Sequence, residues 1–152
     1  TRGGEASALK WKHISSDFGS VWIGESFSRG VTGSTKTKKA RTVNLNPSIS
    51  AMLQARRDRL NPVSDNELVF KSPEGLSIDD RNFNRRAWKT VLAEVGVKYR
   101  KPYTTRKTAI TLSLKSGASY IEVAAACGHD PQTMHKYYSD VIQERSVFVS
   151  LE

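Results

Sequence analysis

Residues 103–138 of the chain read YTTRKTAITLSLKSGASYIEVAAACGHDPQTMHKYY. The apolar residues of this stretch recur at helical spacing, and Gly117 and Gly128 interrupt that spacing. The pattern therefore predicts three short helices with breaks at the two glycines. Ser119 is suited to cap the middle helix, and Pro131 is suited to open the last one, which we expect to end near residue 138.

Short helices joined by tight breaks bring three reactive side chains of this stretch within reach of one another: Arg106, His129 and Tyr138. Each alone is more often structural than catalytic. Together they suit a phosphodiester, whose cleavage needs positive donors on the phosphate oxygens, an in-line nucleophile and a proton for the departing oxygen. The arginine fork holds two oxygens at once, and a phenol with a pKa near ~10 is a nucleophile that needs help in losing its proton. The stretch therefore predicts an anion site with Tyr138 aimed at phosphorus.

In the rest of the chain, the spacing of apolar residues is typical of strands in some segments and of helices in others. Helices are expected over residues 5–12, 47–60 and 78–95 (capped by Ser77). A further helix, which carries Arg106, is expected to be capped by Thr104 or Thr105. A strand over 21–27 is expected to return over 40–45, with a flexible tip at Gly30 and Gly33. Residues 34–39 are expected to form either a basic hairpin tip or the start of a strand. The chain is therefore predicted to be one α+β domain, mainly α-helical, with a small antiparallel β-sheet.

Apolar residues at helical spacing predict which side chains face the core. The positions expected to point inward are Ala8, Leu9, Trp11, Ile49, Met52, Leu53, Leu60, Phe83, Ala87, Trp88, Val91, Leu92, Val95, Ile110, Leu112 and Leu114. His13 and His135 fit no motif, and we expect both at the surface.

The chain is strongly basic, with 24 Lys and Arg residues against 15 Asp and Glu residues and a formal net charge of +9. Such an excess favours a polyanionic partner, of which nucleic acid is the commonest, although a solvated basic face without a partner has the same composition. Cys127 is the single cysteine, so no internal disulfide can form and a reducing compartment is expected. No apolar run approaches the ~20 residues that span a bilayer.

Four segments of the chain resemble the catalytic domain of the tyrosine recombinases, the phage integrase family. They match the family's motifs in order: an arginine box, a lysine hairpin, a second arginine box, and a Gly-His pair followed by tyrosine. The segments are Arg2-Gly3-Gly4-Glu5-Ala6, Thr35-Lys36-Thr37-Lys38-Lys39-Ala40-Arg41-Thr42-Val43, Tyr103-Thr104-Thr105-Arg106-Lys107-Thr108, and Cys127-Gly128-His129 with Tyr138 nine residues after the histidine. The resemblance implies the tyrosine recombinase catalytic core, the DNA breaking-rejoining fold.

The resemblance also implies a role for each matching residue. Arg2 and Arg106 would clamp the scissile phosphate, and Lys36 would protonate the leaving 5′ oxygen. His129 would hydrogen-bond a non-bridging oxygen, and Tyr138 would attack to give a 3′-phosphotyrosine. Residues expected to assist are Glu5 as a support of the site and Lys38, Lys39 and Lys107 as contacts to the DNA backbone. The resemblance implies no metal and no cofactor.

Two positions depart from the family pattern or compete within it. Tyr103 stands where the family usually has histidine, so its phenol is expected to position groups rather than shuttle protons near neutral pH. Tyr137 precedes Tyr138, but only Tyr138 has the family's spacing from His129, and we interpret Tyr137 as a packing residue.

The sequence thus predicts a site-specific DNA recombinase or integrase. A type IB topoisomerase and a catalytically decayed DNA-binding module are the alternatives. The expected partners are a double-stranded DNA attachment site and further copies of the chain, as a tetramer on DNA and a monomer when free, with no membrane partner. We expect a bacterial or phage-encoded cytoplasmic protein acting on the chromosome, and this chain to be the C-terminal part of a longer integrase, without its N-terminal DNA-binding domain. Residues 141–152 form an apolar tail that packs either in cis or on a neighbouring protomer.

Overall fold

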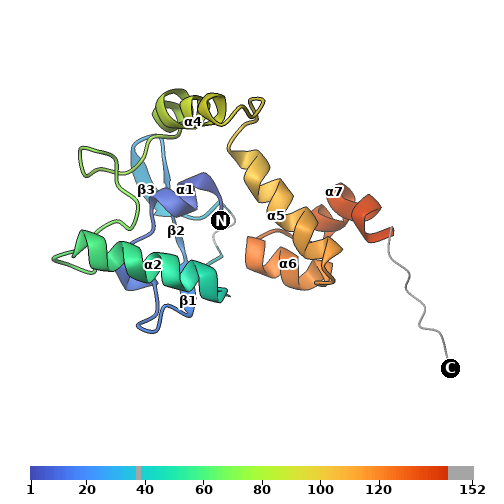
Figure 1. Cartoon of the computed structure of the whole chain (residues 1–152). Coiled ribbons are helices and arrows are strands. Elements are labelled where there is room, and N and C mark those ends of the chain that lie inside the picture. The colour runs from blue at the N-terminus through green and yellow to red at the C-terminus, as the bar shows by residue number, and fades with distance from the viewer. Residues whose placement is uncertain (37–38, 144–152) are drawn as a thin grey trace. The chain divides into compact units, whose positions relative to one another are not determined.

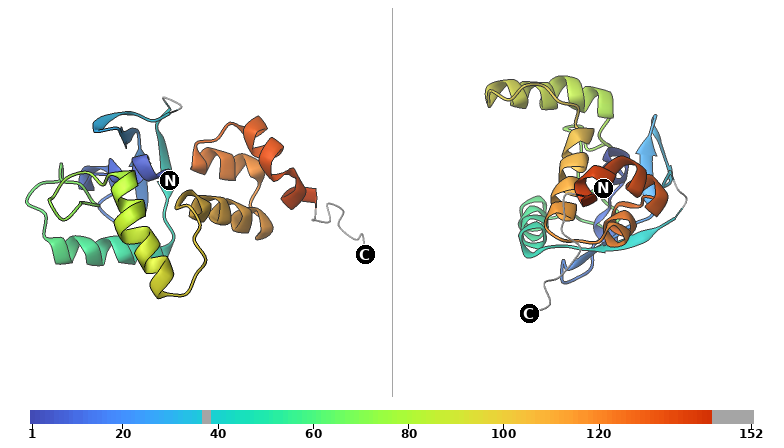
Figure 2. Two further views of the ribbon diagram at one scale, coloured as in Figure 1. Left: turned by 90° about the horizontal axis from the view of Figure 1, so that it is seen from above. Right: turned by 90° about the vertical axis from the view of Figure 1, so that its right-hand side faces the viewer.

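A computed structural model describes residues 1–36 and 39–143 of the chain. The chain divides into two compact units, Thr1–Pro102 (unit 1) and Tyr103–Glu152 (unit 2) (Figures 1 and 2). Unit 1 mixes helices with two small antiparallel sheets, and unit 2 is helical in its described part. The predicted fold class, mainly helical with a small antiparallel β component, is confirmed. In the described part of either unit, no helix combines the length and the apolar character needed to cross a bilayer.

Unit 1 begins with a short helix and then forms its strands. Its elements are α1 (Gly3–Ser7), a 3-10 turn η1 (Trp11–His13), β1 (Ser20–Ile23), β2 (Glu25–Ser28), β3 (Val31–Ser34), β4 (Arg41–Asn44), α2 (Pro47–Leu60), α3 (Asp80–Asn82), a π-helical segment η2 (Phe83–Trp88) and α4 (Lys89–Glu94). The predicted helix over 5–12 is thus two separate turns. The helix over 47–60 is confirmed, with the Asn46 side chain accepting a hydrogen bond from the backbone N–H of Ile49 at 2.9 Å.

The strand predicted over residues 21–27 is two strands that belong to different sheets. β1 pairs with β4, with Val21 opposite Val43, and β2 pairs with β3, with Ser26 opposite Gly33. The break falls at Gly24, where the Trp22 indole lies so close that a Cβ atom would come within 2.1 Å of its ring. Of the two glycines expected at a tip, Gly30 lies in the turn between β2 and β3 with φ +83, whereas Gly33 lies inside β3.

The core of unit 1 forms between the β1–β4 sheet, η1 and α2. Its buried members are Leu9, Trp11, Ile14, Val21, Ile23, Leu53 and Val69. Of the α2 residues expected inward, only Leu53 is buried, and Ile49, Met52 and Leu60 are exposed. Arginine stems take their place: Arg56 lies over the Phe70 ring and donates Nε–H to the Val69 carbonyl, and Arg57 lies over Trp11.

The helical rod from α3 through α4 contributes no buried residue to the core, so the predicted inward stripe of Phe83, Val91 and Val95 is wrong. The rod starts at Asp80 because Asp79, and not Ser77, caps it by accepting from the backbone N–H of Asn82. The chain that follows the rod folds back along it. The Trp88 indole donates to the Arg100 carbonyl at 2.6 Å, and Asn84 hydrogen-bonds the Tyr99 hydroxyl at 3.2 Å.

Unit 2 packs α5 (Tyr103–Lys115), α6 (Tyr120–Cys127) and α7 (Pro131–Gln143) around one apolar cluster (Figures 1 and 2). The cluster consists of Ile110, Leu114, Val123, Ala124 and Met134. The predicted breaks at Gly117 and Gly128 are confirmed, as is the Ser119 cap of α6. Residues 144–152, most of the predicted tail, lie outside the described residues.

Three expectations for unit 2 are wrong. Thr104 and Thr105 do not cap α5, because the helix already begins at Tyr103. Leu112 is 60% exposed, since at about 100° per residue it lies on the face opposite Ile110 and Leu114. Helix α7 does not end near residue 138 but continues to Gln143.

His13 was expected at the surface and is instead 8% exposed, so that prediction is wrong, whereas His135 is exposed as expected. The His13 ring packs 4.9 Å from the Trp22 ring, and its Nδ1 accepts a hydrogen bond from the backbone N–H of Lys10. Burial lowers the pKa of His13 below 6.5; Glu25 works against that shift, and Lys10 and Lys12 add to it. The neutral ring is therefore the form that the fold favours.

We predict that the unfolding free energy falls as the pH drops below 6.5. In that range the unfolded chain binds a proton at His13 that the folded chain resists. Urea denaturation between pH 7.5 and 5 should show this slope in the wild type, a flatter slope in His13→Gln, and the wild-type slope in His135→Gln, which changes an exposed histidine. Equal slopes in all three proteins would contradict the assignment.

Candidate active site

The residues that the sequence predicts for catalysis divide between the two units. Unit 1 carries Arg2, Glu5, Lys36 and Lys39, and unit 2 carries Tyr103, Arg106, Lys107, His129 and Tyr138. Lys38 lies outside the described residues.

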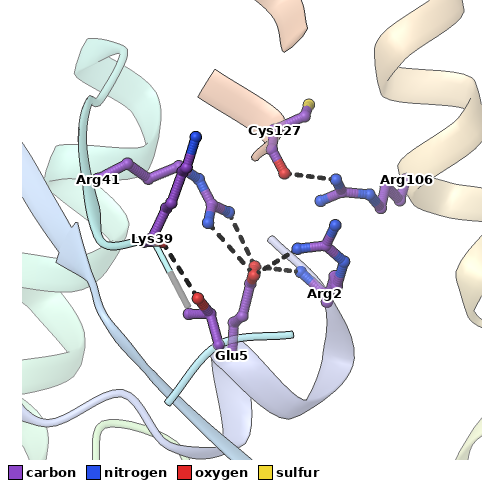
Figure 3. A network of polar contacts seen from close by, with 7 residues as sticks. Arg2, Glu5, Lys39, Arg41, Arg106 and Cys127 are labelled. Carbon is purple, nitrogen blue, oxygen red and sulfur yellow. Dashed lines mark hydrogen bonds and ion pairs between the residues drawn. The ribbon is translucent and has the colours of Figure 1, made fainter. Parts of the chain in front are cut away.

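In unit 1, Glu5 is the centre of a network of hydrogen bonds that joins α1 to β4 (Figure 3). Its Oε1 accepts from Nη1 of Arg2 at 2.9 Å and from Nη1 of Arg41 at 3.2 Å. Its Oε2 accepts from the backbone N–H of Arg2 and from Nη2 of Arg41, both at 2.8 Å. The Glu5 side chain is 1% exposed, so the two arginines surround a carboxylate that has left water.

The pKa of Glu5 shows how completely this carboxylate is satisfied. Burial alone would raise the pKa, but the hydrogen bonds and charge of Arg41, together with the hydrogen bonds of Arg2, outweigh burial and lower it from 4.5 to about 2. Glu5 is therefore ionised at every pH at which the protein would work, and it fixes the position of Arg2 at the start of α1.

The lysine hairpin follows β3 directly. Thr35 is buried and its hydroxyl donates to the Lys39 carbonyl at 3.1 Å, which ties together the two sides of the loop between β3 and β4. Lys36 and Lys39 are exposed. A buried threonine thus anchors a loop that presents basic side chains to solvent.

In unit 2, the end of α6 positions two of the predicted groups. Gly128 adopts φ +66, and its N–H donates to the Ala125 carbonyl while the N–H of His129 donates to the Ala124 carbonyl. This double hydrogen bond is the Schellman motif, which needs a left-handed residue and therefore favours glycine. The motif fixes the backbone at His129 and leaves the Cys127 carbonyl at the end of the helix as an acceptor.

Arg106 uses that acceptor. Its Nη2 donates to the Cys127 carbonyl at 2.6 Å, which holds the guanidinium of α5 against the end of α6 (Figure 3). The residue is 6% exposed, and among the residues that the structure describes its Nε and Nη1 are buried without a hydrogen-bond partner. Buried, unpaired donors on a cation are costly. They suit an anion that binds from outside.

Tyr138 is half-buried and packs against the apolar cluster of unit 2, whereas Tyr137 is 71% exposed. The interpretation of Tyr137 as a packing residue is therefore wrong. Burial raises the pKa of Tyr138, with smaller contributions from Tyr103 and Cys127, and only Arg106 acts to lower it. The pKa of Tyr138 therefore responds to the charge of Arg106, a residue of the same unit. Tyr103 is half-exposed and Lys107 is exposed.

Two partners in these networks were not predicted from the sequence. Arg41 lies within the lysine hairpin segment, but nothing in the pattern pairs it with a glutamate 36 residues away. The Cys127 carbonyl is a backbone group, and no side-chain motif reports a backbone acceptor. The signal that was available is Gly128, since a glycine that ends a helix implies unpaired carbonyls just before it. Within the described residues, no group of three or more His, Cys, Asp and Glu side chains is placed to hold a metal ion.

Comparison with known families identifies the chain. The sequence model of a protein family described as the phage integrase family matches residues 1–145 of this chain. The chain belongs to the phage integrase family. The predicted family, that of the phage integrases or tyrosine recombinases, is thereby confirmed.

Solved structures share the fold at low sequence identity. Tn1549 transposon integrase, in complex with a circular intermediate DNA, is 16% identical with a TM-score of 0.75, over 91% of this chain and 50% of that one. XerA recombinase is 20% identical with a TM-score of 0.70, and the match covers 94% of this chain and 49% of XerA. XerH site-specific recombinase, in a post-cleavage complex with palindromic difH, is 22% identical with a TM-score of 0.66, over 94% and 39%. The chain therefore spans half or less of the length of these proteins, and a search of curated protein sequences gives no significant match.

The network around Glu5 predicts an acid-dependent loss of stability. Because the folded pKa of about 2 lies below 4.5, Glu5 contributes stability that is fully present above pH 4.5 and is lost as the pH falls towards 2. At neutral pH that contribution is about 3 kcal/mol, from about 1.36 kcal/mol per pKa unit.

Chemical denaturation of Glu5→Gln beside the wild type measures this contribution. The difference in unfolding free energy should be largest above pH 5 and should shrink as the pH is lowered to 2. Glu94→Gln, which changes an exposed carboxylate, serves as the control. A difference between Glu5→Gln and the wild type that stays constant with pH would contradict the depressed pKa.

Proposed function

We propose that the chain is the catalytic part of a site-specific DNA recombinase or integrase that cleaves and rejoins DNA through a 3′-phosphotyrosyl intermediate. The observation that carries the proposal is Arg106. It is a buried cation held by one backbone carbonyl, with two N–H groups unpaired among the described residues, and its charge acts on the pKa of Tyr138. An oxyanion donor and a nucleophile in one electrostatic environment are what phosphoryl transfer needs. Membership of the phage integrase family supports the same reaction class.

In the proposed cleavage step, the Tyr138 oxygen attacks phosphorus and the bond from phosphorus to the 5′ oxygen breaks. Arg106 and Arg2 bind the non-bridging oxygens and stabilise the charge of the pentacoordinate transition state, and His129 donates a further hydrogen bond. Lys36, exposed on its anchored loop, gives a proton to the leaving 5′ oxygen. Tyr103 positions the nucleophile in place of the family's usual histidine.

The phenol enters this step protonated, because burial raises the pKa of Tyr138 above its ordinary value of 10. Arg106 is the group that opposes this shift, so it both stabilises the transition state and helps the phenol to lose its proton. That proton passes to bulk water as the bond from the Tyr138 oxygen to phosphorus forms. In the return step, a 5′-hydroxyl of DNA attacks the phosphotyrosine and releases Tyr138. The phosphodiester is exchanged rather than hydrolysed, so the sequence of steps needs no ATP.

The substrate that we propose is a double-stranded DNA attachment site, bound by several copies of the chain as a tetramer. The Tn1549 integrase and XerH structures contain DNA, which supports a DNA partner for this chain. The formal charge of +9 suits a polyanion. Lys39 and Lys107, both exposed, are proposed to contact the DNA backbone, and Lys38 is proposed for the same role from the sequence alone. The proposed setting is a bacterial cell, where the chromosome is the target.

Replacing Tyr138 by Phe tests the nucleophile. The wild type should form a covalent protein–DNA species that survives denaturation when it is incubated with nicked duplexes tiled over the DNA beside its gene. Tyr138→Phe should bind the same DNA but form no adduct, since only the attacking oxygen is lost. Tyr137→Phe, which alters the exposed neighbour, is the matched control and should retain the adduct.

An adduct that persists in Tyr138→Phe and disappears in Tyr137→Phe would show that the nucleophile is misassigned. Binding by the wild type without any adduct would favour the decayed DNA-binding module. Relaxation of supercoiled plasmid without strand exchange would favour a type IB topoisomerase.

Replacing Arg106 by Ala tests the oxyanion donor. The cleavage rate should fall by at least ~10²-fold, the usual effect of losing one preorganised donor, while DNA binding changes far less. Arg59→Ala removes the same charge from an exposed position on α2 and should cleave at the wild-type rate. Single-turnover cleavage of the nicked duplex measures both variants, and a near-normal rate for Arg106→Ala would remove it from the site.

A further inference from the structure

Arg41 has no role in the cleavage steps above, yet it makes the most extensive side-chain contact in the network of unit 1. From β4 it reaches Glu5 of α1, 36 residues away in the chain, and spans both carboxylate oxygens with Nη1 and Nη2 at 3.2 Å and 2.8 Å (Figure 3). Arg2 reaches the same carboxylate with one side-chain nitrogen and its backbone N–H. The carboxylate therefore accepts four hydrogen bonds, which fills its acceptor capacity.

We propose that Arg41 is a positioning residue for Arg2. It neutralises Glu5, so that Glu5 can fix Arg2 in place without cancelling the positive charge that Arg2 brings to a DNA phosphate. The inference rests on the proposed function, in which Arg2 binds the scissile phosphate.

The charge count of the network shows why a second arginine is needed. Arg2 and Glu5 alone sum to zero, and a neutral pair attracts a phosphate weakly. With Arg41 the three side chains sum to +1, so the network as a whole attracts an anion instead of being neutral. Because Glu5 is buried, its charge is poorly screened by water, and an uncompensated carboxylate there would pull strongly on Arg2.

The exposures of the two arginines agree with this division of roles. The side chain of Arg41 is 11% exposed and that of Arg2 is 22% exposed. The more buried arginine makes the two-pronged contact, and the more accessible one makes the single side-chain contact. Both guanidinium groups approach the carboxylate from different sides, as Figure 3 shows. Arg41 is thus the structural counter-ion, and Arg2 is the cation placed nearer to solvent.

Lysine would not replace Arg41 fully. An ammonium group supplies the charge but not the planar fork that spans two oxygens, so it neutralises Glu5 without fixing the carboxylate plane. Two other carboxylates belong to the surroundings of α1. Glu25 lies in β2, which packs against α1, and is paired with Lys10 at 2.9 Å. The Asp80 carboxylate lies beside Gly3. The charged groups that act on the pKa of Glu5 are Arg41 and Arg2.

The test compares single-turnover cleavage of the nicked duplex by four variants. Arg41→Ala should cleave at least ~10-fold more slowly than the wild type, because misplacing a catalytic group by about 1 Å has effects of this order or larger. Arg41→Lys should lie between the two. Arg59→Ala removes one exposed charge and should match the wild type. The double variant Arg41→Ala with Glu5→Gln returns the network to +1 and should recover much of the lost rate.

The pH profile separates this role from a merely structural one. Without Arg41, the buried Glu5 should bind a proton more readily, and its protonation removes the negative charge that holds back Arg2. The ratio of the Arg41→Ala rate to the wild-type rate should therefore rise as the pH is lowered from 8 to 5. Circular dichroism on each variant confirms that the compared proteins are folded. If Arg41→Ala does not fold, Arg41→Lys and the double variant carry the test.

Three results would overturn the inference: a folded Arg41→Ala that cleaves at the wild-type rate, a rate ratio that does not change with pH, or a double variant as slow as Arg41→Ala. Where Arg41→Ala does not fold, the inference would be overturned if Arg41→Lys cleaves at the wild-type rate and the double variant is folded but inactive. Absence of any adduct with the wild type would instead refute the proposed function, so the two failures are distinguishable in one gel.

Discussion

Burial of charge is the constraint on which this structure depends, and its two units meet that constraint in opposite ways. Glu5 is surrounded by four donors from Arg2 and Arg41, so a buried carboxylate becomes a fixed part of the fold. Arg106 binds one backbone carbonyl and keeps two N–H groups unpaired within the described residues. A satisfied charge of the first kind stabilises a scaffold, whereas an unsatisfied charge of the second kind is tolerated where a ligand binds.

The scaffold of unit 2 explains how so small a region positions these groups. Three helices share one apolar cluster, and each break between them has a local cause: Gly117, the Ser119 cap and the left-handed Gly128. The Schellman motif at Gly128 sets the Cys127 carbonyl for Arg106 and the backbone of His129 in the same turn. Local helix chemistry thus sets the Cys127 carbonyl and the His129 backbone, and the contact of Arg106 with Cys127, 21 residues away, completes the arrangement.

Features with local causes were predictable from the sequence, and features with distant causes were not. Helix α2, the Ser119 cap and the break at Gly128 follow from neighbouring residues, and the family follows from the spacing of Arg106, His129 and Tyr138. The pairing of Arg41 with Glu5 and the burial of His13 depend on residues brought together by folding. Helix periodicity also predicted too many core residues. Arginine stems cover part of the core in place of apolar side chains, and the π-helical segment η2 contains no buried residue.

The central claim is that Tyr138 becomes covalently joined to DNA, and peptide mapping by mass spectrometry tests it most directly. The wild-type chain is incubated with the nicked duplexes, denatured, and digested with protease and nuclease. The account predicts a residual nucleotide 3′-phosphate mass on the oxygen of Tyr138. An adduct on Tyr137 or Ser139, or no adduct on DNA that the chain demonstrably binds, would contradict it.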